Sequence, residues 1–139
     1  MFEHCETLNN LYIPNTITKL SDSSIFNYCY SLRNFIIPET ITSLGYRVFG
    51  SCYSLANLKI PSAVTSIGSY AFADCFGMNY YDFSNHTSVP TLEGTNAFTN
   101  IPSDCKIIVP DNLYDTWIAA TNWSTYASYI IKKTDWEAL

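Results

Sequence analysis

The sequence predicts a mainly β solenoid, in which short parallel strands stack in successive coils of about 23 residues. The first observation is a five-residue motif that occurs four times, as HCETL, YCYSL, SCYSL and DCFGM, each time with a cysteine at its second position. Each motif is preceded by a phenylalanine, and the steps between these are 24, 23 and 23 residues: Phe2, Phe26, Phe49 and Phe72. The second observation is that 47% of the 139 residues are hydrophobic, which is enough for a continuous core.

Within each coil, the first element is a half-buried strand. Leu58 and Ile60 alternate with Asn57 and Lys59, so the two apolar side chains share one face of the strand. A proline follows and ends the strand, because it has no amide hydrogen for a ladder; the prolines are Pro14, Pro38 and Pro61, with Ser84 in the fourth copy.

The second element is a shorter strand over Ile17–Leu20, Ile41–Leu44, Val64–Ile67 and, displaced by two residues, Val89–Leu92. Its threonines point outward and are expected to stack on their copies: Thr18, Thr42 and Thr65. A turn then leads to the next phenylalanine. Phe98 follows Phe72 by 26 residues, so we expect that coil to be irregular.

The period lies in the range of leucine-rich repeats, roughly 20–29 residues. The units resemble those of the BspA-type leucine-rich repeat family, most closely over 49–75, FGSCYSLANLKIPSAVTSIGSYAFADC. The resemblance implies a leucine-rich-repeat solenoid from a surface or secreted bacterial protein, with repeats that serve in adhesion or protein binding.

The repeats are expected to be closed at one end only. We predict one domain over 1–139, with four coils and the start of a fifth in 1–104, and a C-terminal cap of a strand plus a short helix in 105–139. Lys106–Val109 is the expected last strand, Asp111 the helix N-cap, and an apolar cluster covers the stack: Trp117, Trp123, Tyr126 and Ile130. A carbohydrate platform is the alternative role for the two tryptophans.

The chain opens at Phe2 in mid-repeat, without a capping element. We therefore expect a C-terminal fragment of a longer protein. On this interpretation the Phe2 end is poorly ordered or packs against another molecule, and end-to-end association through this uncapped coil is one way to cover it.

The four repeated cysteines are expected to form a buried ladder of free thiols: Cys5, Cys29, Cys52 and Cys75. Side chains at equivalent positions of stacked coils run parallel, whereas a disulfide needs them turned towards each other, so an occasional disulfide is the weaker alternative. Parallel thiols cannot surround a tetrahedral metal ion either. Cys105 lies outside the ladder, and its state is open.

No catalytic, cofactor or metal site is expected. His4 and His86 lie far apart, and phosphate-loop, serine-hydrolase and zinc-protease motifs do not occur. A formal charge of −5 disfavours nucleic acid as a partner. No apolar run approaches the ~18 residues of a membrane span, so membrane insertion is not expected.

The function is therefore expected to lie on a surface. The outward strand positions form two columns that we predict to bind a protein, such as a host matrix or surface protein: Asn10, Asn34, Asn57 and Tyr80, and Tyr12, Ile36, Lys59 and Asp82. A second candidate stripe consists of Tyr30, Tyr53 and Phe76. A structural spacer and a weak glycan-binding surface are the alternatives. We expect an extracellular or cell-surface location, with the export signal outside this fragment.

Overall fold

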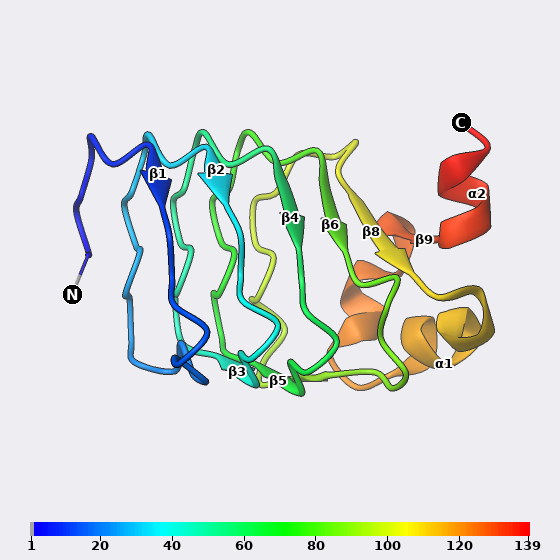
Figure 1. Cartoon of the computed structure of the whole chain (residues 1–139). Coiled ribbons are helices and arrows are strands. Elements are labelled where there is room, and N and C mark those ends of the chain that lie inside the picture. Colours follow the sequence, from blue (N-terminus) through cyan, green and yellow to red (C-terminus); the bar gives the residue numbers. More distant parts are fainter. Residues whose placement is uncertain (1) are drawn as a thin grey trace.

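The computed structural model describes residues 2–139 and shows coils stacked side by side along one axis (Figure 1). The main strands follow one another along one side of the stack: β1 (Asn10–Leu11), β2 (Asn34–Phe35), β4 (Asn57–Lys59), β6 (Tyr80–Asp82) and β8 (Lys106–Val109). A second side carries β3 (Ser43–Leu44), β5 (Ser66–Ile67) and β7 (Thr91–Leu92). The predicted leucine-rich-repeat solenoid is confirmed.

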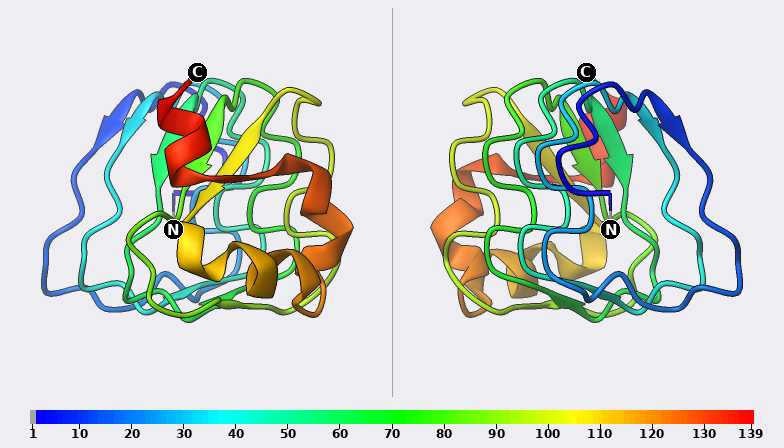
Figure 2. Two further views of the ribbon diagram at one scale, coloured as in Figure 1. Left: turned by 90° about the vertical axis from the view of Figure 1, so that its right-hand side faces the viewer. Right: turned by 90° about the vertical axis from the view of Figure 1, so that its left-hand side faces the viewer.

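The strand pairs in residues 2–139 are parallel, and those between successive coils follow the register of the sequence repeat. Asn10 pairs with Asn34, and Ser43 pairs with Ser66. The main side is divided into two sheets. One is β1–β2, and the other is β4–β6–β8–β9, in which β9 is Ile130–Lys132; among residues 2–139 no strand ladder joins β2 to β4. Figure 2 shows the traces of the first two coils, in blue and cyan, lying outside the green ones on this side.

On the third side, each coil is bound to the next coil by backbone hydrogen bonds that lie outside the named strands. The Phe26 N–H donates to Val48 O at 3.0 Å, and the Phe49 N–H donates to Ala71 O at 2.8 Å. Non-glycine residues with left-handed backbone recur beside these bonds, and one series is His4, Tyr28, Ser51, Asp74 and Asn100. Main-chain bonds therefore tie the coils on this third side as well as on the two strand sides, apart from the break between β2 and β4.

The phenylalanines form a column through the core. Successive rings of Phe2, Phe26, Phe49, Phe72 and Phe98 lie 5.7, 5.5, 5.9 and 5.2 Å apart and are nearly parallel. Rings from the main strands pack against this column at an angle, as Phe35 does against both Phe26 and Phe49. One coil cannot bury such rings alone, so each depends on its two neighbours.

The C-terminal segment covers one end of the stack (Figure 2, left). It runs through η1 (Asp111–Leu113), α1 (Tyr114–Ala119), η2 (Trp123–Tyr129), β9 (Ile130–Lys132) and α2 (Lys133–Glu137). Trp117 and Trp123 are buried, and the Trp123 indole N–H donates to Pro90 O at 2.7 Å. These tryptophans close the core, as predicted, and their burial rules out the carbohydrate platform.

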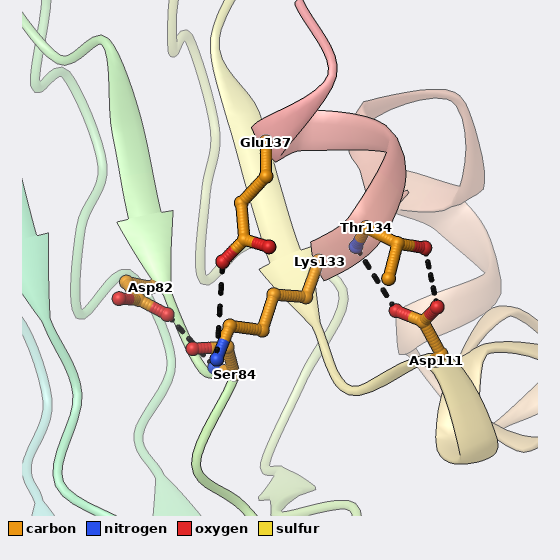
Figure 3. A network of polar contacts seen from close by, with 6 residues as sticks. All are labelled: Asp82, Ser84, Asp111, Lys133, Thr134 and Glu137. Atoms are coloured by element: carbon orange, nitrogen blue, oxygen red, sulfur yellow. Dashed lines mark hydrogen bonds and ion pairs between the residues drawn. The ribbon is translucent and has the colours of Figure 1, made fainter.

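Two details of the predicted cap are wrong. Lys106–Val109 is a strand, as expected, but it is not the last one, because β9 pairs with it in parallel. Asp111 is the first residue of η1 and does not cap the helix that follows it; its carboxylate instead accepts hydrogen bonds from the backbone N–H and the hydroxyl of Thr134, which anchor α2 (Figure 3). The division of the chain at residue 104 stays a prediction.

The N-terminal coil is paired on one side only. Phe2 is half-buried, stacks on Phe26, and donates its N–H to Ile25 O at 3.0 Å. No element among residues 2–139 lies over the outer side of this coil (Figure 2, right). The expected disorder or packing of this end against another molecule, and the longer parent protein, stay predictions.

Candidate functional site

The strand face, made by the outward side chains of β1, β2, β4 and β6, holds all eight residues of the two predicted columns. Asn10, Asn34 and Asn57 are exposed, and the Asn34 Nδ2 donates to Asn10 Oδ1 at 3.1 Å. Such amide pairs follow from the parallel register, which places equal side chains side by side. The amides keep further donors and acceptors for a ligand.

Two large apolar side chains stand out from this face. Tyr12 is 79% exposed and Ile36 is 83% exposed, although each directly follows a strand whose inward residues are packed into the core. A hollow of about 230 Å³ lies beside them, and its lining includes Asn10, Asn15, Asn34 and Pro38. A concave surface with apolar walls and amide groups suits a side chain of a protein partner.

The next positions in the same column are charged. The Lys59 ammonium lies 3.5 Å from a Glu39 carboxylate oxygen, and both side chains are largely exposed. The Asp82 carboxylate accepts the Ser84 backbone N–H at 2.8 Å, so its orientation is fixed by its own strand end (Figure 3). This part of the face can recognise polar groups but presents no apolar anchor.

The other column, which consists of Asn10, Asn34, Asn57 and Tyr80, is partly covered at its C-terminal end. The ring of Trp136, on α2, packs on Tyr80 with centroids 5.1 Å apart. α2 lies beside this end of the main strands and is held there by the bonds between Thr134 and Asp111 (Figure 3). Tyr80 is therefore half-buried instead of solvated, and sequence reasoning missed this because residues 130–137 belong to no repeat.

The edge stripe of Tyr30, Tyr53 and Phe76 is a stack of rings. Tyr30 and Tyr53 lie 4.6 Å apart, and Tyr53 and Phe76 lie 5.1 Å apart, with interplanar angles of 17° and 26°. His4 stacks on Tyr28 in the same way at 4.6 Å. The ring faces between these neighbours are therefore covered, while Phe76, at the end of the stack, is 54% exposed.

Arg47 adds a charge to this part of the surface. Its guanidinium lies 4.8 Å from the Tyr70 ring centroid, and its Nε donates to the Tyr46 hydroxyl at 3.0 Å. Sequence reasoning missed this group because the arginine occurs in a single copy of the repeat.

The repeated cysteines are free thiols, and all but the half-buried Cys5 are buried. The expected ladder is therefore present without a disulfide among residues 2–139. Each buried thiol of the ladder donates to a phenylalanine carbonyl one coil earlier, for example Cys52 to Phe26 O at 3.3 Å. Cys105 is also buried and free, while Ile101 takes the place three residues after Phe98.

Burial makes these thiols poor nucleophiles. It raises the pKa of Cys29 to about 11, and the pKa of both Cys75 and Cys105 to about 12. His86 is buried with its two ring nitrogens 3.2 and 3.3 Å from the Phe83 and Val64 carbonyl oxygens, and burial lowers its pKa. Within residues 2–139, no cluster of three or more His, Cys, Asp or Glu side chains is placed to hold a metal ion.

No helix in the described part of the chain combines the length and the hydropathy that crossing a bilayer requires.

Comparisons with known proteins agree with the fold. A solved structure of a leucine-rich cell surface protein from Faecalibacterium prausnitzii is 35% identical to the chain, with a TM-score of 0.58. The match covers 66% of this chain but only 24% of that protein, so the chain spans about a quarter of its length. The alignment supports a shared repeat architecture.

A leucine-rich repeat protein from Bacteroides ovatus aligns over 78% of this chain and 51% of its own, at 13% identity and a TM-score of 0.30, which is too loose to support an argument. Among curated protein sequences, none matches. Residues 1–116 match the family described as BspA type leucine rich repeat region, in six copies. The chain therefore belongs to the BspA-type leucine-rich repeat family.

Proposed function

We propose that the chain is a non-catalytic, cell-surface interaction module that binds a protein partner through its strand face. The observation that carries the proposal is the exposure of Tyr12 and Ile36 on a backbone fixed by parallel pairing. Large apolar groups held at fixed positions lose little conformational entropy on binding, and their burial is favourable. The name of the Faecalibacterium relative, a cell surface protein, supports the location.

The chemistry of the face indicates what kind of partner fits. It presents an apolar corner, at Tyr12 and Ile36, next to uncharged amides, and an exposed ion pair between Lys59 and Glu39. α2 bounds it where Trp136 covers Tyr80. We therefore expect a partner with an apolar anchor that enters the hollow and polar groups that meet the amides. A host matrix or surface protein with an exposed apolar loop has this character.

The test compares two double variants against a panel of purified matrix and surface proteins. Tyr12→Ser with Ile36→Ser removes the apolar corner, while Tyr53→Ser with Phe76→Ser removes a similar area from the edge stripe. Binding measured by biolayer interferometry should weaken at least tenfold, about 1.4 kcal/mol, in the first variant and stay unchanged in the second. Unchanged binding by the first variant, with its circular dichroism intact, would place the site elsewhere.

The two alternatives make different predictions. If the chain is a structural spacer, neither the parent chain nor either variant binds any protein of the panel. If the chain binds glycans, the parent chain should bind members of a glycan array, and the edge stripe is the expected binding site. The stacking of Tyr30, Tyr53 and Phe76 argues against that role, because a sugar ring packs on an aromatic face and their inner faces are covered.

A further inference from the structure

The edge stripe contains two phenols in close contact. The Tyr30 and Tyr53 ring centroids lie 4.6 Å apart, and the interplanar angle is 17°. The two residues occupy equivalent places in successive coils, so parallel stacking sets like atoms of the two rings side by side. The distance between the rings is close to that between the two ring centres of a biphenyl. The carbons ortho to the two hydroxyls therefore need only a small side-chain movement to meet.

Other contacts between tyrosine rings in residues 2–139 are wider and crossed. Their centroids lie 5.9 to 6.2 Å apart at interplanar angles of 53° to 76°, in the pairs Tyr28 with Tyr30, Tyr46 with Tyr70, and Tyr126 with Tyr129. Phe76 continues the stack beyond Tyr53 at 5.1 Å, but its ring has no hydroxyl to oxidise. An oxidised phenol in this stack therefore has one tyrosine as its stacked neighbour.

The two rings are reachable from the solvent, whereas the thiols beside them are not. Tyr53 is 40% exposed, and Tyr30 is half-buried. Cys29 and Cys52 directly precede these tyrosines but are fully buried, and burial raises the pKa of both thiols. A one-electron oxidant in the solvent therefore contacts the phenols of the edge stripe before it reaches these sulfur atoms.

The pair also spans the junction at which the main-side ladder is interrupted. Tyr30 precedes β2 in the second coil and Tyr53 precedes β4 in the third coil, and no strand ladder within residues 2–139 joins these two strands. Backbone bonds hold this junction on another side, for example from the Phe26 N–H to Val48 O at 3.0 Å. A covalent bond between the rings would therefore add a tie between two coils that lack the main-side ladder.

We propose that Tyr30 and Tyr53 are a site of oxidative cross-linking, at which a one-electron oxidant of the peroxidase class joins the two rings and ties the second coil to the third. Each phenol loses one electron and its hydroxyl proton, which gives two phenoxyl radicals. The radicals form one carbon–carbon bond between their ortho carbons, and the hydrogen on each of these carbons moves to the phenol oxygen. One hydrogen peroxide takes up the two electrons and two protons and leaves as two waters. Because both radicals are held in one stack, their coupling is intramolecular and is favoured over coupling between molecules in dilute solution.

The test treats the whole chain, in dilute solution, with a haem peroxidase and a limited amount of hydrogen peroxide. The product is reduced, alkylated and digested with trypsin, and the peptides are identified by mass spectrometry. A bond between Tyr30 and Tyr53 joins peptide 20–33 to peptide 48–59 with the loss of two hydrogen atoms. The reduction is needed because a disulfide between Cys29 and Cys52 would join the same two peptides.

The joined peptide should be at least tenfold more abundant from the parent chain than from Tyr30→Phe or Tyr53→Phe, because each variant keeps the ring stack but loses one phenol. Tyr28→Phe is the matched control. It removes the other phenol of peptide 20–33, which lies outside the stack, and should leave the yield unchanged.

Two further readouts test the geometry and its effect. Phe76→Tyr extends the stack by one phenol, so Tyr53 should then also couple on that side, which joins peptide 48–59 to peptide 60–106. The cross-linked parent chain should unfold at a higher urea concentration than the untreated chain, because the bond closes a loop in the unfolded state. The same treatment of Tyr53→Phe should leave its midpoint unchanged.

Three results would overturn the proposal. One is a treated parent chain without the joined peptide, or a Tyr30→Phe chain that retains it. Another is a joined peptide that combines heavy and light halves after treatment of a mixture of chains with and without heavy nitrogen, because coupling would then take place between molecules. The third is a cross-linked chain whose urea midpoint does not rise. The double variant Tyr12→Ser with Ile36→Ser should give the yield of the parent chain, so the outcome is independent of the proposed function.

Discussion

Replacing one phenylalanine of the core column by alanine should cost an amount that depends on the coil in which it lies. Phe49 is buried, with ring neighbours on both sides at 5.5 and 5.9 Å and Phe35 at 5.1 Å. Phe49→Ala therefore loses a full side-chain burial and leaves a cavity, for about 3–5 kcal/mol. Phe2 is half-buried and has one ring neighbour in the column, Phe26, so Phe2→Ala should cost only about 1 kcal/mol.

The assay is urea unfolding followed by circular dichroism, with the free energy of unfolding taken from the midpoint and slope. In thermal unfolding the melting temperature should fall by roughly 10–17 °C in the Phe49 variant and by about 3–4 °C in the Phe2 variant, from the usual entropy per residue. If Phe49→Ala does not fold, the pair Phe49→Leu and Phe2→Leu gives the same comparison at smaller cost. Equal losses at the two positions would refute the reasoning, because they would mean that neighbouring coils do not share the burial.

Three further predictions each concern the substitution of a single residue. Burial lowers the pKa of His86 below its usual value, although the Val64 and Phe83 carbonyls oppose the shift. The unfolded chain therefore binds more protons, and the free energy of unfolding should fall as the pH drops from about 7 to about 5, a slope that His86→Gln removes. Ser24 has a φ of 63°, so Ser24→Gly should stabilise the fold by about 0.5–1 kcal/mol in urea unfolding, whereas Ser23→Gly, outside the left-handed region, should not. Asp111→Ala removes the acceptor for Thr134 and should loosen α2, so acrylamide quenching of Trp136 should rise; unchanged quenching would show that Trp136 alone holds the helix.

The parts of the fold that the sequence predicts are those that repeat. Leu58 and Ile60 are buried while Asn57 and Lys59 are exposed, as the alternation requires. The same positions carry the same kind of residue in each coil, so the period itself fixes strand order and register. The predicted columns are therefore in place as geometry, and their role in binding stays a proposal.

Some of the parts that sequence reasoning missed occur only once in the chain. β9 and α2 have no copy elsewhere in the chain, so no period marks them or the contact of Trp136 with Tyr80. The break between β2 and β4 is also invisible in the pattern, since Asn34 and Asn57 occupy equivalent places.

The left-handed turns were missed because glycine is the usual signal for them. In residues 2–139 no glycine has a positive φ, whereas Arg47 and Ser51 do. Glycine serves close approach instead. A Cβ on Gly45 would lie 2.5 Å from Ser21 O, and a Cβ on Gly68 would lie 2.6 Å from the Gly45 carbonyl carbon. The small residues are therefore needed where neighbouring coils touch, and the strain of the turns falls on residues with side chains.

The buried reactive groups of this chain are kept in their neutral forms, and this bears on function. Burial raises the pKa of Cys75 and Cys105 to about 12 and lowers that of His86, so thiol and imidazole are both uncharged at neutral pH. A thiolate nucleophile and its cationic partner are thereby both disfavoured. Cysteine at the ladder positions is instead explained by two properties. Its small side chain fills the space between coils, and its weak S–H donor binds a carbonyl oxygen of the preceding coil. The exposed groups that the proposed binding uses are therefore those of the strand face, such as Tyr12 and Ile36.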